Sequence, residues 1–154
     1  MNRKGGRVLT YVNSPVNMQL VRIARDRWDV LGILDGRGDC QVLDFLRQLP
    51  PNYAAARRWM LQFLLLQLPA MGPPRHNAEL CKSLGDGIFE LRRQPKGQKL
   101  RTLFFYDDTN RIVLTNAFLK AETTPRTELA LARTLRKRYF EAKFRHELQI
   151  VKET

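Results

Sequence analysis

Short apolar runs separated by turn residues dominate the middle of this chain. Residues 28–34 are apolar and rich in β-forming side chains, and the Asp-Gly-Arg-Gly run at 35–38 ends them as a turn. Three further runs of this kind follow later, with hairpin-length turns between them. The pattern therefore predicts four strands, over 28–34, 88–93, 100–107 and 111–118.

Three other segments repeat apolar residues at helical spacing. Asp39 can cap a first helix, which the two prolines at 50–51 end. Asn52 can cap a second helix that forms a helical hairpin with the first. The run Thr-Thr-Pro at 123–125 is a typical helix start, and the basic helix that it opens is expected to run to about His146.

The order of these elements is strand, helix, helix, strand, strand, strand, helix. It predicts an α+β fold in which the helices pack on one face of a mostly antiparallel sheet of about four strands. Residues 1–27 carry a weak pattern, with a short strand possible at 8–12 and a basic helical turn at 17–27, and we interpret them as an N-terminal extension. The predicted domain is 28–146, followed by a C-terminal tail over 147–154.

Charge narrows the choice of partner. The 154 residues are enough for one domain with a core, and 27 Lys and Arg against 15 Asp and Glu give a net charge of +12. Such a field favours nucleic acid or an acidic protein. Cys40 and Cys81 are expected to be reduced core thiols. The apolar run at 59–68 is too short to cross a bilayer, and no apolar signal segment follows Met1, so we expect a cytoplasmic protein without a membrane partner.

Several motifs occur together in the second half of the chain. Leu-Gly-Asp-Gly-Ile-Phe-Glu-Leu-Arg fills 84–92, Leu-Arg-Thr-Leu-Phe-Phe-Tyr fills 100–106, Ala-Phe-Leu-Lys fills 117–120, and Thr124-Pro125 precedes the basic helix. In this order they resemble the phage-derived, HigB-like branch of the RelE/HigB/ParE toxin superfamily of type II toxin–antitoxin systems, over about 28–146. The resemblance implies a RelE-like α+β fold, an antitoxin partner that often carries a helix-turn-helix, and ribosome-dependent cleavage of messenger RNA.

Basic residues on neighbouring strands are consistent with metal-free and cofactor-free RNA cleavage, in which the ribose 2′-OH attacks the adjacent phosphate. Fixed cations would stabilise the charge that develops on the phosphoryl oxygens. If the strands pair antiparallel, Arg92, Arg101 and Lys120 converge on one surface. The resemblance places Arg92 and Arg101 at basic catalytic positions and Lys120 near a further one. The alternatives are that Arg92 solvates the sheet or pairs with Glu90 or Asp86, that Arg101 is an arginine at the sheet edge, and that Lys120 is only a charge flanking the last helix.

The general base is less clear from the residues. Glu90 lies on the Arg92 side of its strand and is our candidate base, with Tyr106 as a second acid candidate. His76 and His146 are expected to be surface residues. Some relatives use a lysine or a tyrosine of the last helix, and the tyrosine of this helix, Tyr139, lies late in it.

Seven Lys and Arg side chains lie between 126 and 145. They predict contact with RNA through phosphate neutralisation, although a solvated helix face or a site for an acidic antitoxin segment would show the same pattern. The residues predicted to bind RNA are Arg93, Lys96, Arg126, Arg133, Arg136 and Lys137.

The leading hypothesis is a toxin that cleaves translated messenger RNA. Two alternatives stay open. One is an inhibitor of DNA gyrase that performs no chemistry, as the ParE relatives do. The other is a basic RNA-binding protein that has kept the fold without the activity.

Overall fold

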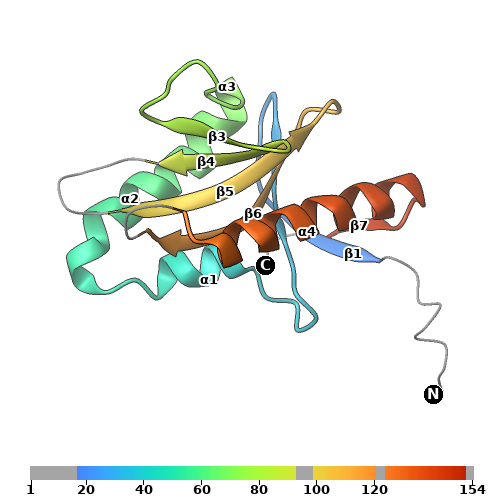
Figure 1. Cartoon of the computed structure of the whole chain (residues 1–154), viewed down its shortest axis with the longest axis horizontal. Coiled ribbons are helices and arrows are strands. Elements are labelled where there is room, and N and C mark those ends of the chain that lie inside the picture. The colour runs from blue at the N-terminus through green and yellow to red at the C-terminus, as the bar shows by residue number, and fades with distance from the viewer. Residues whose placement is uncertain (1–16, 93–98, 121–123, 152–154) are drawn as a thin grey trace.

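Seven strands form one mixed sheet in the computed structural model, which describes residues 17–92, 99–120 and 124–151 (Figure 1). The order across the sheet is β3-β4-β5-β6-β2-β1-β7. The strands are β1 (Met18–Arg25), β2 (Asp29–Ile33), β3 (Cys81–Gly85), β4 (Ile88–Arg92), β5 (Leu100–Asp107), β6 (Arg111–Leu119) and β7 (Leu148–Val151).

Strand direction divides the sheet into two parts. β3, β4, β5 and β6 are consecutive antiparallel neighbours. β2 joins β6 in parallel, β1 pairs with β2 antiparallel, and β7 pairs with β1 in parallel. The three hairpin strands predicted from the sequence therefore form one side of the sheet.

Helices cover both faces of the sheet rather than one. The first face carries α1 (Gln41–Arg47), η1 (Pro51–Tyr53), α2 (Ala54–Gln62), η2 (Phe63–Gln67) and α3 (Leu68–Met71). The second face carries α4 (Arg126–Phe144). Consecutive residues of β5 alternate between these layers: Phe104 packs in the first core, and Leu103 and Phe105 in the second. The α+β class was predicted correctly, but the single helical layer and the sheet of about four strands were wrong.

Three strands, β1, β3 and β7, were not predicted, because their hydrophobic patterns are weak. In β1, Met18 and Leu20 pack on the α4 side and Val21 and Ile23 on the other, so both faces are apolar and the alternation of a half-exposed strand is lost. The basic helical turn predicted at 17–27 was therefore wrong. The edge strands are β3, for which no strand was predicted, and β7, which was predicted as tail, and they bury only one side chain between them, that of Cys81.

The predicted helix caps also need correction. The first helix begins at Gln41 after Cys40, and no side chain caps it, so Asp39 does not serve as the N-cap. Asn52 lies within the 3₁₀ turn η1, and Tyr53 precedes α2. The short strand predicted at 8–12 lies outside the described residues. The start of the last helix agrees with prediction, because Pro125 occupies its N-cap position.

A buried carboxylate fixes α4 to the sheet. Asp107, at the end of β5, is 4% exposed and accepts hydrogen bonds from Tyr139 Oη (2.6 Å) and Lys143 Nζ (3.0 Å), as well as from Thr109 Oγ1 (2.5 Å). Burial raises the pKa of Asp107, but these donors together outweigh it and leave the pKa below its ordinary value. Burial and the bond to Asp107 raise the pKa of Tyr139.

The lowered pKa of Asp107 predicts a pH-dependent contribution to stability. The ionised carboxylate stabilises the fold fully above the unfolded-state pKa of about 3.9, and this contribution is lost as the pH falls through the lower folded-state value. Asp107→Asn should lower the free energy of unfolding by about 1.5–3 kcal/mol at neutral pH. Urea unfolding at neutral and acidic pH should show the gap to the wild type narrowing at acidic pH.

The neighbouring residue supplies the control. Asp108 has a side chain that is 96% exposed, so Asp108→Asn should change stability by less than about 0.5 kcal/mol. If the difference in free energy of unfolding between Asp107→Asn and the wild type stayed constant or grew at acidic pH, the pKa of Asp107 would not be lowered in the folded protein.

Candidate functional site

The ends of three strands bring the predicted catalytic cations to one end of the sheet. β4 ends and β5 begins there, and the antiparallel register pairs Arg92 directly with Arg101. Side chains of directly paired residues lie on the same face, about 5 Å apart at Cβ. Lys120 follows β6 at the same end, where its backbone N–H donates to Lys99 O at 2.8 Å. The structure thus brings together the three positions that strand alternation grouped.

Glu90 is the centre of this cluster. Its carboxylate lies 3.6 Å from Arg101 Nε and 3.4 Å from Lys120 Nζ, and it accepts a hydrogen bond of 2.5 Å from Thr124 Oγ1. Glu90 is fully buried and Arg101 is 1% exposed. One carboxylate therefore faces two cations in a water-poor region, where electrostatic interactions are strong.

Arg101 is held away from solvent. Burial lowers the pKa of its guanidinium; Glu90 opposes this effect, and the nearby charge of Arg92 adds to it. One terminal nitrogen donates to the carbonyl of Leu100 at 3.0 Å, while Nε is buried without a hydrogen-bond partner. A phosphate can contact Arg101 only after Glu90 or its neighbours move aside.

Arg92 is more accessible than Arg101. It is half-buried, and its Nη2 atom donates to the carbonyl of Ala78 at 2.8 Å, in the turn before β3. No carboxylate of the described residues lies within ion-pair distance of it. Within the described part of the chain, its positive charge therefore has no carboxylate partner.

Other predicted residues lie apart from this cluster. Tyr106 is on the opposite face of the sheet, where it packs on Phe89 and accepts a hydrogen bond from Arg75 at 3.0 Å. Arg126 is exposed at the start of α4, and His76 is exposed in a turn. The remaining two predicted RNA contacts, Arg93 and Lys96, lie outside the described residues.

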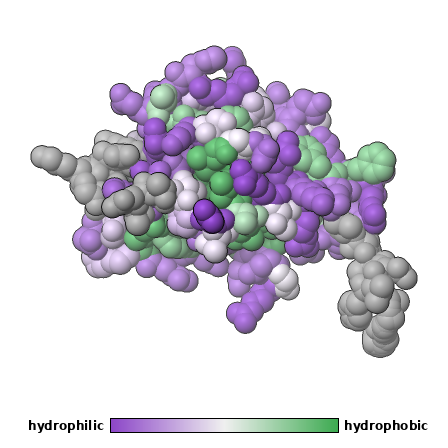
Figure 2. Space-filling view, in the orientation of Figure 1, coloured by the Kyte–Doolittle hydropathy of each residue, from purple (hydrophilic) through white to green (hydrophobic). Residues whose placement is uncertain are grey.

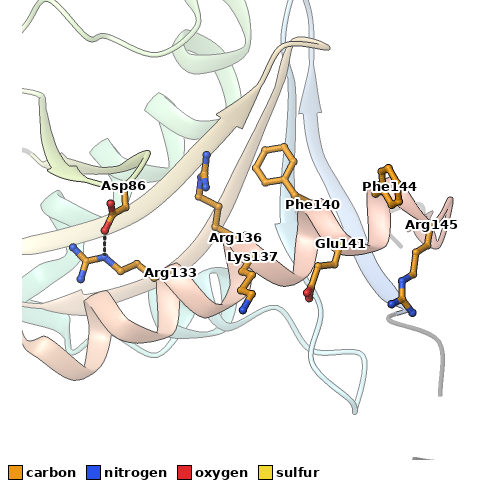
Figure 3. Close-up of a pocket in the computed structure, with 8 residues that line it drawn as sticks. All are labelled: Asp86, Arg133, Arg136, Lys137, Phe140, Glu141, Phe144 and Arg145. Carbon is orange, nitrogen blue, oxygen red and sulfur yellow. Dashed lines mark ion pairs between the residues drawn. The ribbon is translucent and has the colours of Figure 1, made fainter. Parts of the chain in front are cut away.

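A basic groove runs along the exposed side of α4 (Figure 3). Its volume is about 590 Å³. Three residues predicted to bind RNA line it, namely Arg133, Arg136 and Lys137. Arg133 pairs with Asp86 of the β3–β4 turn at 3.2 Å. The groove and the Glu90 cluster thus bring most of the predicted cations to two places on the α4 side of the molecule.

Comparison with models of known protein families shows to which family the chain belongs. The model of phage-derived Gp49-like proteins (DUF891) matches residues 44–137, from within α1 to within α4. The chain belongs to this Gp49-like family. This is a RelE/HigB-like family of toxins from toxin–antitoxin systems, so the chain is a toxin-family protein with a cognate antitoxin as its expected partner. None of the curated proteins matches the chain.

The matched segment of this Gp49-like protein includes the whole Glu90 cluster. The described residues of the whole chain contain no group of three His, Cys, Asp or Glu side chains that could hold a metal ion. Among those described residues, no helix is long and apolar enough to cross a membrane.

Sequence reasoning missed two kinds of residue in the Gp49-like protein. Thr124 was interpreted only as part of a helix start, and its contact with Glu90 depends on how α4 meets the sheet. Phe140 and Phe144 line the basic groove. They are four residues apart on one helix, close in sequence to Lys137, so helical spacing alone could have identified them.

Removing the central carboxylate should destabilise the fold. Glu90→Gln keeps the side-chain volume but leaves the buried Arg101 without its counter-charge, which typically costs about 3–5 kcal/mol. Urea unfolding at neutral pH measures the loss. The control is Asp44→Asn on α1, where an exposed carboxylate pairs with Arg47 and a change below about 0.5 kcal/mol is expected. Equal stability of Glu90→Gln and the wild type would show that Arg101 does not depend on Glu90.

Proposed function

We propose that this Gp49-like protein is a toxin that cleaves messenger RNA on the ribosome without a metal ion. One observation carries the proposal: Arg92 and Arg101 are direct partners on adjacent strands, with Lys120 at the same sheet end. Two of these cations, Arg101 and Lys120, lie beside the carboxylate of Glu90, and Arg92 lies next to Arg101. Guanidinium groups suit this role because they present several donors to phosphate oxygens in a fixed geometry.

In the proposed reaction, the ribose 2′-oxygen forms a bond to phosphorus as the bond from phosphorus to the 5′-oxygen breaks. The products are a 2′,3′-cyclic phosphate and a 5′-hydroxyl, which takes its proton from water. Arg92 and Lys120 contact the phosphate first, because both are more exposed than Arg101 and no carboxylate of the described residues lies within ion-pair distance of Arg92. The phosphate then replaces Glu90 beside Arg101, and the released carboxylate accepts the 2′-OH proton.

The exposed cations of α4 provide the longer-range attraction in this proposal. Arg126, Arg133 and Lys137 are exposed along one helix and neutralise phosphates of the messenger or the ribosomal RNA. Arg136, Arg93 and Lys96 complete the proposed set. The antitoxin, which we propose carries a helix-turn-helix, would have to cover this surface or the cluster in order to neutralise the toxin.

Burial of Arg101 favours a second candidate function, namely binding without chemistry. A guanidinium that is 1% exposed and paired with a buried carboxylate is also what a purely structural ion pair requires. In that case the same fold would inhibit DNA gyrase in the manner of the ParE relatives, or would bind RNA without cleaving it.

Expression of variants separates these functions. Arg92→Ala should reduce cleavage by about 10²–10³-fold, because it removes one fixed donor to the transition state. Primer extension on a translated transcript, after induction of the toxin, measures cleavage within the reading frame. Arg101→Ala should abolish cleavage as well. Of the two substitutions, only Arg92→Ala is expected to leave the free energy of unfolding unchanged.

Arg47→Ala is the matched control. Arg47 lies on α1, on the other side of the sheet, with a side chain that is 68% exposed, and its removal should leave cleavage unchanged. DNA damage without cut RNA would support gyrase inhibition instead. Harmless expression of the wild-type chain would support the inactive alternative.

A further inference from the structure

An exposed aromatic ring stands at the end of the basic groove. Phe144, the last residue of α4, is 86% exposed, and Phe140 lies half-buried one turn earlier. Both line the groove together with cationic side chains (Figure 3). The space-filling view shows hydrophilic side chains along most of this face and an apolar group where α4 ends (Figure 2). An aromatic ring so exposed on a charged surface suggests a ligand with a flat apolar face.

The position of Phe144 is fixed by the end of the helix. His146 adopts a left-handed backbone conformation with φ of 59°. Its N–H donates to Lys143 O at 3.1 Å, and the N–H of Glu147 donates to Ala142 O at 2.7 Å. These two bonds form a Schellman motif, which satisfies the last carbonyls of the helix. The chain then enters β7, so Phe144 is held on both sides by regular structure.

The floor of the groove is also preformed. The Arg136 guanidinium lies 4.9 Å from the centre of the Phe140 ring. It packs on Gly87, where an added Cβ would come within 2.7 Å of Arg136 Nε. Arg133 is tied to Asp86 beside it. Guanidinium and ring are thus stacked before any ligand binds, which reduces the entropy lost on binding.

The charge of the groove distinguishes between kinds of partner. Its lining carries four cations and two carboxylates, against only two apolar side chains. Arg and Phe are enriched in protein–protein interfaces, but Lys, Asp and Glu are depleted there, and Lys137, Asp86 and Glu141 all line this groove. Sites for single-stranded nucleic acid combine a positive groove with aromatic rings on which bases stack. The composition therefore favours a nucleic acid strand over a protein helix.

We propose that the groove binds a segment of unpaired RNA, with one base stacked on the Phe144 ring and the adjacent phosphates next to Lys137 and Arg145. The inference rests on the proposed function, which makes RNA the substrate. It adds a second contact that is separate from the Glu90 cluster, since α4 spans about 27 Å from Arg126 to Phe144. Stacking is tolerant of sequence, so this contact supplies affinity without a base preference.

Binding of single-stranded RNA tests the proposal without relying on cleavage. All protein samples carry Arg92→Ala, so that the RNA is not cleaved. The probe is an unstructured labelled RNA of about 16 nucleotides, the upper site size of a single OB-fold domain that binds single-stranded nucleic acid. Fluorescence anisotropy across a salt series gives Kd. Phe144→Ala should weaken binding about ten-fold with an unchanged salt slope, whereas Phe144→Tyr should retain affinity. Lys137→Ala should reduce the slope of log Kd against log salt by about 0.7.

Two controls make the result specific to stacking. Leu66→Ala removes another exposed apolar side chain, 66% exposed on η2 of the opposite face, and should leave Kd unchanged. An abasic version of the RNA should bind with equal affinity to the protein that retains Phe144 and to the protein that carries Phe144→Ala. Because Phe144 is largely exposed, its substitution removes little buried surface, and thermal unfolding should confirm an intact fold.

The outcomes separate this inference from the proposed function. Equal RNA affinity of Phe144→Ala and Phe144 would overturn the inference, even if the toxin cleaves messenger RNA. The inference would also be overturned if Phe144→Ala bound RNA normally but no longer co-purified with the antitoxin, since the groove would then be a binding site for protein. Loss of affinity in Phe144→Ala would support the inference even if the wild-type chain cut no RNA.

Discussion

The arrangement of this molecule depends on one buried carboxylate. Glu90 connects three strand ends and the start of α4 through Arg101, Lys120 and Thr124. A buried ion pair contributes little net stability, because desolvation offsets its attraction, but loss of one partner is costly. Glu90 therefore determines where the cations lie more than how stable the fold is. Without it, the positive charges would repel one another in a region that water cannot screen.

The last helix is fixed to the sheet along its length, and this joins the two candidate sites into one rigid unit. Near its start, buried Asn116 donates to the Glu128 carboxylate at 2.8 Å. Near its end, Asp107 holds Tyr139 and Lys143. Between these points the buried side chains of Ala132 and Ala142 pack in the second core. The same helix thus connects the Glu90 cluster with the groove, and in the proposed function a nucleic acid strand that contacts both would follow α4.

The sequence was informative where turn residues or proline mark the ends of an element, even where both faces are buried, as in β5. β5, β6 and α4 agree with prediction within about two residues, because turns and proline mark their ends. β1 escaped prediction because its apolar and polar residues do not alternate regularly, and β3 and β7 because they lie at sheet edges with few buried side chains. Strand alternation grouped Arg92 with Arg101. It could not show that Arg101 is buried, because burial depends on how Glu90, Thr124 and α4 close over it.

Charge balance explains how such a closed cluster can still favour a reaction. Arg101 and Lys120 face the single carboxylate of Glu90, and among the described residues no carboxylate lies within ion-pair distance of Arg92 beside them. A phosphodiester brings one negative charge, and its transition state carries more on the phosphoryl oxygens. When Glu90 accepts the 2′-OH proton in the proposed reaction, its negative charge is lost while negative charge grows on the phosphoryl oxygens. The cations therefore interact more strongly with the transition state than with the bound substrate, and an interaction that strengthens in this way accelerates the step instead of only tightening binding. A cluster built only for stability would instead pair each cation with its own carboxylate, as Arg22 pairs with Asp29 on the neighbouring strands. The excess of cations at this end of the sheet thus supports the catalytic interpretation in spite of the burial of Arg101.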